Sequence, residues 1–152
     1  VVIGSPIVGS SLAWPLKLSG NRSIAFMLFN AMWAFRLGIK VASPFISRDP
    51  RFPEMMDRDL SRTTLESFLL SIASLHRTDL RPMLNEIQIP SMGMDGDLDN
   101  IVSPHEWKPM LAGIPSTRIE RFKNAGHFIM LDEPEFFTET LKDFLDDETE
   151  RT

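Results

Sequence analysis

The chain has 152 residues, of which 43% are hydrophobic and 24% are charged, as in an ordinary globular domain. It contains no cysteine, which excludes disulfides, thiolate nucleophiles and zinc–thiolate sites. The net charge of -5 argues against nucleic acid as a partner, because no cluster of Lys and Arg offsets it. Since a cytoplasmic protein needs no disulfides, we expect a cytoplasmic location.

The first stretch, residues 1–4, is apolar and β-branched, and Gly and Pro residues follow it, as at the end of a buried strand. The sequence GSSLA around Ser11 is similar to a G-x-S-x-G nucleophile elbow. An elbow needs a strand before the serine and a helix directly after it, whereas Pro6 and Pro15 flank this one. No further buried strand is predicted before residue 89. Ser11 is therefore a weak candidate nucleophile, and a serine-rich loop is the favoured interpretation.

Residues 23–37 are almost wholly apolar, with Ser23 as a candidate N-cap and Gly38 as the residue that ends a helix. The run is short for a membrane span, and Asn30 and Arg36 interrupt it, so we expect no stable span. We predict a helix that lines an apolar pocket or lid; a plain core helix is the alternative.

The next segments are predicted as a loop and two helices. Residues 44–59 contain three prolines and mixed charges, which favours a loop or a chain of short turns. Thr63 and Glu66 match a capping box before a helix that reaches Leu75, and residues 79–86 form a second, shorter helix. His76 follows the first helix and is interpreted as a cation near its C-terminus.

The last third predicts two buried strands, at residues 89–94 and 117–122, each followed by a turn and a helix. The first helix begins with Ser103 as cap, Pro104 at its first position and Glu106 at its third. Asp132 to Glu135 cap the last helix. Asp95, Asp97 and Asp99 crowd the first turn with a spacing similar to a calcium loop. That loop needs Gly at its sixth position, where this chain has Asn100, so we predict no metal site.

The turn after each strand presents one titratable residue of interest, Asp99 in the first and His127 in the second. Both turns lie at the carboxyl edge of a parallel sheet, where ligands bind in open α/β folds. A histidine there can act as a base, and a carboxylate beside it can orient the imidazole. The alternative is that Asp99 only caps its turn and His127 is a packed turn residue. His105 is expected to be exposed and without a role.

The order of these elements resembles the C-terminal half of the α/β-hydrolase fold over residues 75–145. The sequence GDLDNIV from Gly96 is similar to the acid turn of that family. The sequence NAGHF up to Phe128, with Leu131, Pro134 and Phe137 after it, is similar to its histidine loop and closing helix. The resemblance implies Asp99 as the acid and His127 as the base. Asp95 departs from the family pattern, which has an apolar or aromatic residue there.

The resemblance also implies an organisation. Residues 1–9 would be a strand and loop of the core sheet, residues 10–80 a helical cap, and residues 81–152 the C-terminal part of the core. The nucleophile would lie upstream of Val1, so this chain alone is expected to be inactive. The complete protein would hydrolyse a carboxylic ester or a similar small apolar substrate without a cofactor. The alternative is a non-catalytic remnant that binds a ligand or partner, and an exposed sheet edge predicts self-association.

Overall fold

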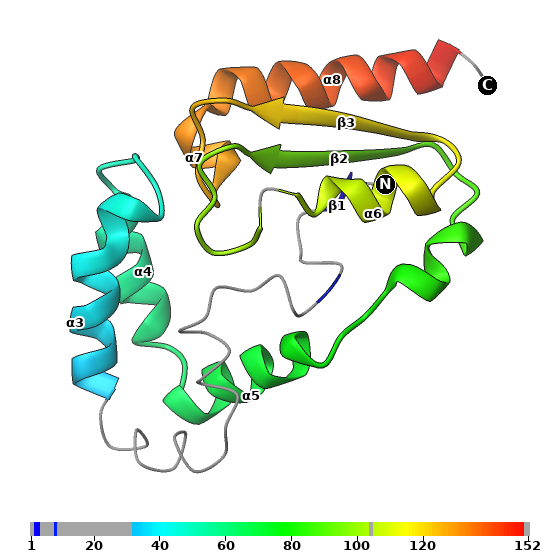
Figure 1. The fold of residues 1–152 in the computed structure, drawn as a ribbon. Coiled ribbons are helices and arrows are strands. Elements are labelled where there is room, and N and C mark those ends of the chain that lie inside the picture. The colour runs from blue at the N-terminus through cyan, green and yellow to red at the C-terminus, as the bar shows by residue number, and fades with distance from the viewer. Residues whose placement is uncertain (1, 4–7, 9–31, 104, 151–152) are drawn as a thin grey trace.

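The protein is described here by a computed structural model that covers residues 2–3, 8, 32–103 and 105–150 (Figure 1). Its centre is a parallel sheet in the order β1-β2-β3, formed by β1 (Val2–Ile3), β2 (Ser91–Gly96) and β3 (Thr117–Phe122). Strands β2 and β3 pair along their whole length, from Ser91 opposite Thr117 to Gly96 opposite Phe122. The parallel sheet flanked by helices confirms the predicted α/β class.

Helices cover both faces of the sheet, with α8 (Pro134–Glu150) on one side and α6 (Trp107–Gly113) on the other (Figure 1). Alternate residues of β2 point to opposite faces. Met92 and Met94 join the core that includes Phe122 and Phe144 of α8. On the other face, a Cβ on Gly93 would lie within 3.0 Å of the Met110 and Ile119 side chains. The glycine therefore lets α6 pack close to the sheet.

The first half of the described chain is helical. It comprises α3 (Met32–Ala42), η2 (Ser43–Phe45), α4 (Phe52–Leu60), α5 (Leu65–His76) and η3 (Arg81–Glu86). Figure 1 shows α3 and α4 side by side, beyond the ends toward which β2 and β3 point. The guanidinium of Arg36 joins them by donating to both carboxylate oxygens of Asp57, at 2.8 and 2.7 Å.

The prediction of a loop or short turns over residues 44–59 is wrong from Phe52 onward, because α4 begins there. Proline is tolerated in the first turn of a helix, where its missing N–H has no intrahelical partner, and Pro53 lies there. The turn before the helix is held by Asp49, whose Oδ1 accepts from the Arg51 N–H at 2.8 Å. The three prolines of this stretch therefore lie in the short helix η2, in the turn before α4 and in the first turn of α4.

Other boundaries also differ from the predictions. Helix α3 continues through Gly38 to Ala42; the predicted N-cap Ser23 lies outside the described residues. The N-cap of α5 is Thr64, which accepts from the Ser67 N–H at 3.1 Å, and not Thr63. Helix α6 begins at Trp107, four residues after the predicted cap Ser103. A carboxylate oxygen of Glu106, predicted to serve that cap, instead accepts from the Val8 N–H at 3.1 Å.

Two further differences lie next to the turns. Strand β2 runs from Ser91 to Gly96, two residues later than predicted at each end, because pairing with β3 carries it through Asp95. A short helix that was not predicted, α7 (Ile129–Asp132), follows His127. The strand predicted at residues 117–122 is confirmed.

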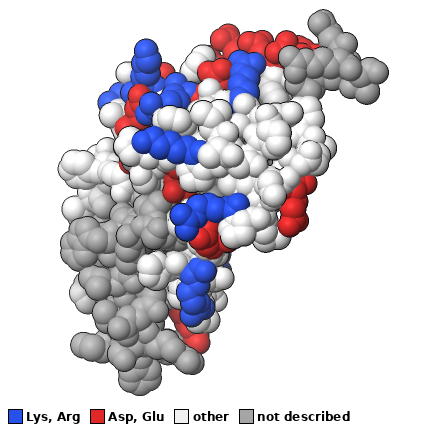
Figure 2. All heavy atoms as spheres, turned by 45° about the vertical axis from the view of Figure 1, so that its right-hand side comes forward, with Lys and Arg blue, Asp and Glu red and all other residues white. Residues whose placement is uncertain are grey.

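Among the described residues, no helix is long and apolar enough to cross a membrane. Nor do these residues bring three or more His, Asp or Glu side chains together as a metal site would require. On the face drawn in Figure 2, basic and acidic side chains lie beside one another.

Candidate active site

The acid turn begins where β2 ends. The Asp97 N–H donates to the Phe122 carbonyl at 2.9 Å, and the Asp99 N–H donates to the Gly96 carbonyl at 3.1 Å. Oδ1 of Asp99 then accepts from the backbone N–H groups of Ile101 and Val102, at 2.8 and 3.0 Å. The Asp99 side chain is 11% exposed. These two backbone hydrogen bonds within its own turn thus fix the orientation of the Asp99 carboxylate.

The histidine turn packs directly on the acid turn. The Leu98 N–H donates to the Ala125 carbonyl at 3.1 Å. A Cβ on Gly96 would overlap the carbonyl oxygens of Ala125 and Gly126. Glycine at position 96 is therefore required by the close approach of two backbones, and this approach brings Asp99 and His127 together.

The two predicted residues form a hydrogen-bonded pair, with Nδ1 of His127 2.9 Å from Oδ2 of Asp99. An ionised carboxylate only accepts hydrogen bonds, so Nδ1 is the donor in this pair and Nε2 is left as an acceptor. The His127 side chain is 25% exposed. Its ring also meets the Phe128 ring edge-on, at a centroid distance of 5.1 Å. Such an imidazole, oriented at one nitrogen and basic at the other, can take a proton from a nucleophile.

The other two aspartates of this region have a different environment, beside Arg121 of β3. The Arg121 guanidinium is ion-paired with Asp97, and its Nε lies 3.8 Å from Oδ2 of Asp95, too far for a hydrogen bond. Burial raises the pKa of Asp95 to about 6, against the opposing effect of the Arg121 charge. Neither Asp95 oxygen has a hydrogen-bond partner among the described residues. Asp99 thus differs from Asp95 and Asp97 in its partner, since it pairs with His127 and they lie beside Arg121.

The remaining sequence candidates lie elsewhere. His76 is the last residue of α5, and both it and His105 are exposed. The weak candidate Ser11 lies outside the described residues. Within the described part of the chain, no hydroxyl group donates to the His127 ring.

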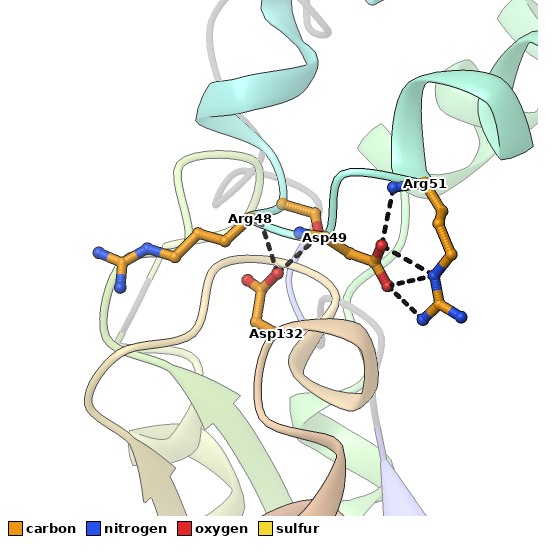
Figure 3. A network of polar contacts seen from close by, with 5 residues as sticks. Arg48, Asp49, Arg51 and Asp132 are labelled. Atoms are coloured by element: carbon orange, nitrogen blue, oxygen red, sulfur yellow. Dashed lines mark hydrogen bonds and ion pairs between the residues drawn. The ribbon is translucent and has the colours of Figure 1, made fainter.

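Sequence reasoning missed the residues that hold the histidine turn from the other side. Asp132 was predicted to precede the last helix, but its Oδ2 accepts from the Gly126 N–H at 2.7 Å, and its Oδ1 binds the segment around Ser47 (Figure 3). Asn100 Nδ2, one residue after Asp99, donates to the Phe45 carbonyl at 2.5 Å. The sequence carries no local signal for the contacts to Phe45 and Ser47, because these partners lie 55 and 85 residues away.

Comparison with known proteins identifies the fold. The chain superposes on MGS-M2, an alpha/beta hydrolase enzyme from a Medee basin deep-sea metagenome library, with a TM-score of 0.57 and 19% identity over 88% of this chain and 52% of that one. The chain has the α/β-hydrolase fold. An esterase from Exiguobacterium antarcticum is a second α/β-hydrolase neighbour, with a TM-score of 0.62 and 24% identity over 83% of this chain and 48% of that one.

A curated relative from Pseudomonas putida is 34% identical to this α/β-hydrolase chain over 97 residues. It is 2-hydroxy-6-oxononadienedioate/2-hydroxy-6-oxononatrienedioate hydrolase 2. The match covers 62% of the chain but 34% of the relative, so the chain spans about a third of the length of the relative it matches. No family model matches the chain.

Proposed function

We propose that this chain contributes the acid and the base of a hydrolase active site, with His127 as general base and Asp99 as the residue that orients it. The observation that carries the proposal is the 2.9 Å contact between His127 Nδ1 and Asp99 Oδ2. Because Oδ1 of Asp99 is already occupied by two backbone donors, Oδ2 is the oxygen left for the imidazole. We assign residues 10–80 to a helical cap and residues 1–9 and 81–152 to the core.

In the proposed reaction, a nucleophile from a part of the protein that the structure does not describe transfers its proton to Nε2 of His127 as it attacks the substrate carbonyl. The imidazolium is stabilised by the Asp99 carboxylate, which remains ionised. His127 then returns the proton to the leaving group. A water molecule, activated by the same nitrogen, releases the acyl group from the nucleophile and completes the hydrolysis.

The substrate class is proposed from the apolar cap and from the relatives. Trp33, Leu37 and Val41 form one exposed stripe of α3, at 71, 56 and 68% exposure, which favours an apolar substrate. An esterase neighbour supports a carboxylic ester. The higher identity of the Pseudomonas putida relative favours a second candidate substrate, 2-hydroxy-6-oxononadienedioate or 2-hydroxy-6-oxononatrienedioate.

The proposal is tested by assaying p-nitrophenyl butyrate and 2-hydroxy-6-oxononadienedioate with the chain alone and with the chain coexpressed with a strand–Ser elbow–helix segment. We expect activity only in the complemented sample. The variants His127→Gln and Asp99→Asn should each reduce that activity by about a thousandfold or more. The control His105→Gln, at an exposed histidine, should leave it unchanged. Full activity in His127→Gln would refute the proposed base. Activity of the chain alone that Ser11→Ala abolishes would refute the position of the nucleophile.

A further inference from the structure

One carboxylate ties the histidine turn to a distant segment of the chain. Asp132 closes α7, five residues after His127. Its Oδ1 accepts from the Ser47 hydroxyl at 2.6 Å and from the Arg48 N–H at 2.7 Å (Figure 3). Its Oδ2 accepts from the Gly126 N–H at 2.7 Å. Gly126 directly precedes His127. The same side chain therefore fixes the residue before the proposed base and a segment 84 residues away.

The distant segment, residues 43–52, also touches the active-site turns elsewhere, and we call it the strap. A Cβ on Gly126 would lie 2.7 Å from the Ile46 carbonyl oxygen, so the strap backbone passes directly against the histidine turn. The Phe52 ring, 1% exposed, packs on the Phe128 ring at a centroid distance of 4.9 Å. At its start, the Phe45 carbonyl accepts from Asn100 of the acid turn. The strap thus contacts both turns.

Hydrogen bonds within the strap hold its own residues in place. Ser47 and Asp49 are 5% and 8% exposed. The Asp49 N–H donates to the Ser47 hydroxyl at 3.2 Å, so that hydroxyl accepts from its own segment and donates to Asp132. The exposed Arg51 guanidinium donates from Nε to Oδ1 of Asp49 and from Nη2 to Oδ2, and it lowers the pKa of that carboxyl. The hydroxyl that reaches Asp132 is therefore held in a defined orientation.

From this geometry we infer that Asp132 is a positioning residue, whose carboxylate transmits the position of the strap to the Asp99–His127 pair. The inference rests on the role proposed for His127. A carboxylate is required because three donors converge on it and it can accept from all of them. An amide would turn its NH₂ toward the Gly126 N–H in one orientation and toward the Arg48 N–H in the other. Asn at position 132 therefore leaves at least one backbone N–H without an acceptor in either orientation.

The experiment compares Asp132→Asn with Asp143→Asn, a matched change at an exposed position of α8, by NMR of the ¹⁵N-labelled chain at fixed pH. In Asp132→Asn, we expect amide exchange at Gly126 or Arg48 to accelerate about tenfold, as for one lost hydrogen bond. The signature specific to positioning is the His127 Nδ1–H proton, whose exchange with water should also accelerate about tenfold. In Asp143→Asn both rates should equal those of the parent chain.

Asp99→Asn separates this inference from the proposed function. If the Nδ1–H resonance is insensitive to Asp99→Asn, the pair itself is absent in solution and the proposed function fails. If Asp99→Asn removes the resonance while Asp132→Asn leaves its exchange unchanged, the pair stands and the positioning role is overturned. Should circular dichroism show that Asp132→Asn does not fold, Ser47→Ala decides. Faster exchange at Gly126 and at His127 Nδ1, neither of which Ser47 touches, supports transmission through Asp132. An effect confined to Arg48 and Asp49 overturns it.

Discussion

Replacing Asp95 by Asn should stabilise the protein above neutral pH and have little effect in acid. The Asp95 side chain is 20% exposed, its oxygens lack hydrogen-bond partners among the described residues, and its pKa is raised from 3.8 to about 6, chiefly by burial. The Arg121 guanidinium opposes this effect, but it pairs more closely with Asp97. Ionised Asp95 is therefore a charge that folding removes from water without full compensation.

The sign follows from the two states of the carboxyl. Below the unfolded pKa, Asp95 is protonated whether the chain is folded or not, and it imposes no penalty. As the pH rises toward 6, the unfolded chain releases this proton and the folded chain retains it, so the free energy of unfolding falls. Above about pH 7 the loss is complete. The difference between the two pKa values corresponds to about 3 kcal/mol, and the remaining solvent contact of the side chain reduces our expectation to about 1–2 kcal/mol.

The assay is urea unfolding of the parent chain and the Asp95→Asn variant at pH 4 and pH 8, with Asp143→Asn as an exposed control. The gain of the variant should be close to zero at pH 4 and about 1–2 kcal/mol at pH 8. The control should stay within about 0.5 kcal/mol of the parent at both. A variant less stable than the parent at pH 8 would show that Arg121 compensates the Asp95 charge. A gain that is equal at both pH values would refute ionisation as its cause.

Two other paired substitutions test the backbone geometry by urea unfolding. Gly96→Ala should destabilise the protein by about 3 kcal/mol, because the new Cβ meets carbonyl oxygens of the histidine turn. Gly38→Ala should stabilise it by about 0.5–1 kcal/mol, since this helical position has open space around it; equal effects at the two glycines would contradict the close approach of the turns. Thr64→Ala removes the N-cap of α5 and should lower the free energy of unfolding by about 1 kcal/mol, whereas Thr63→Ala should change it by less than about 0.5 kcal/mol. The reverse order would assign the cap to Thr63.

The sequence predicted the elements whose signals are local. Strand β3 was predicted from its alternating pattern, and the two turns were predicted from the Gly, Asp and Asn residues that follow the strands. The family resemblance adds the identity of Asp99. The order of the turns along the chain, together with parallel pairing, was enough to predict that Asp99 and His127 lie near one another. The close packing of Gly96 on the histidine turn brings the two side chains to the observed distance of 2.9 Å between His127 Nδ1 and Asp99 Oδ2.

What the sequence could not predict depends on partners far along the chain. Helix α4 was mistaken for a loop because proline both breaks helices and begins them, and only the surrounding hydrogen bonds decide between the two. Glu106 was predicted at the third position of the helix that Ser103 caps, yet it binds the backbone of Val8, 98 residues away. Asp132 was likewise interpreted as part of a helix start, because its distant partners Ser47 and Arg48 leave no local signal in the sequence. An acidic residue before a helix is ambiguous when a distant donor competes for it.

The Asp99–His127 pair is built chiefly within residues 91–132, since β2, β3 and their two turns supply every hydrogen bond described for Asp99 and His127. The strap is the exception, because it comes from the helical half of the chain and reaches the pair through Asp132 and Asn100. If the helical half is displaced, the position of His127 should therefore change more than that of Asp99, because the Asp99 carboxylate is held by its own turn. This asymmetry predicts that substitutions in the strap change the exchange of the His127 Nδ1 proton more than that of the Ile101 and Val102 amides. Equal changes at both would mean that the two turns move as one body and that the strap supports them together.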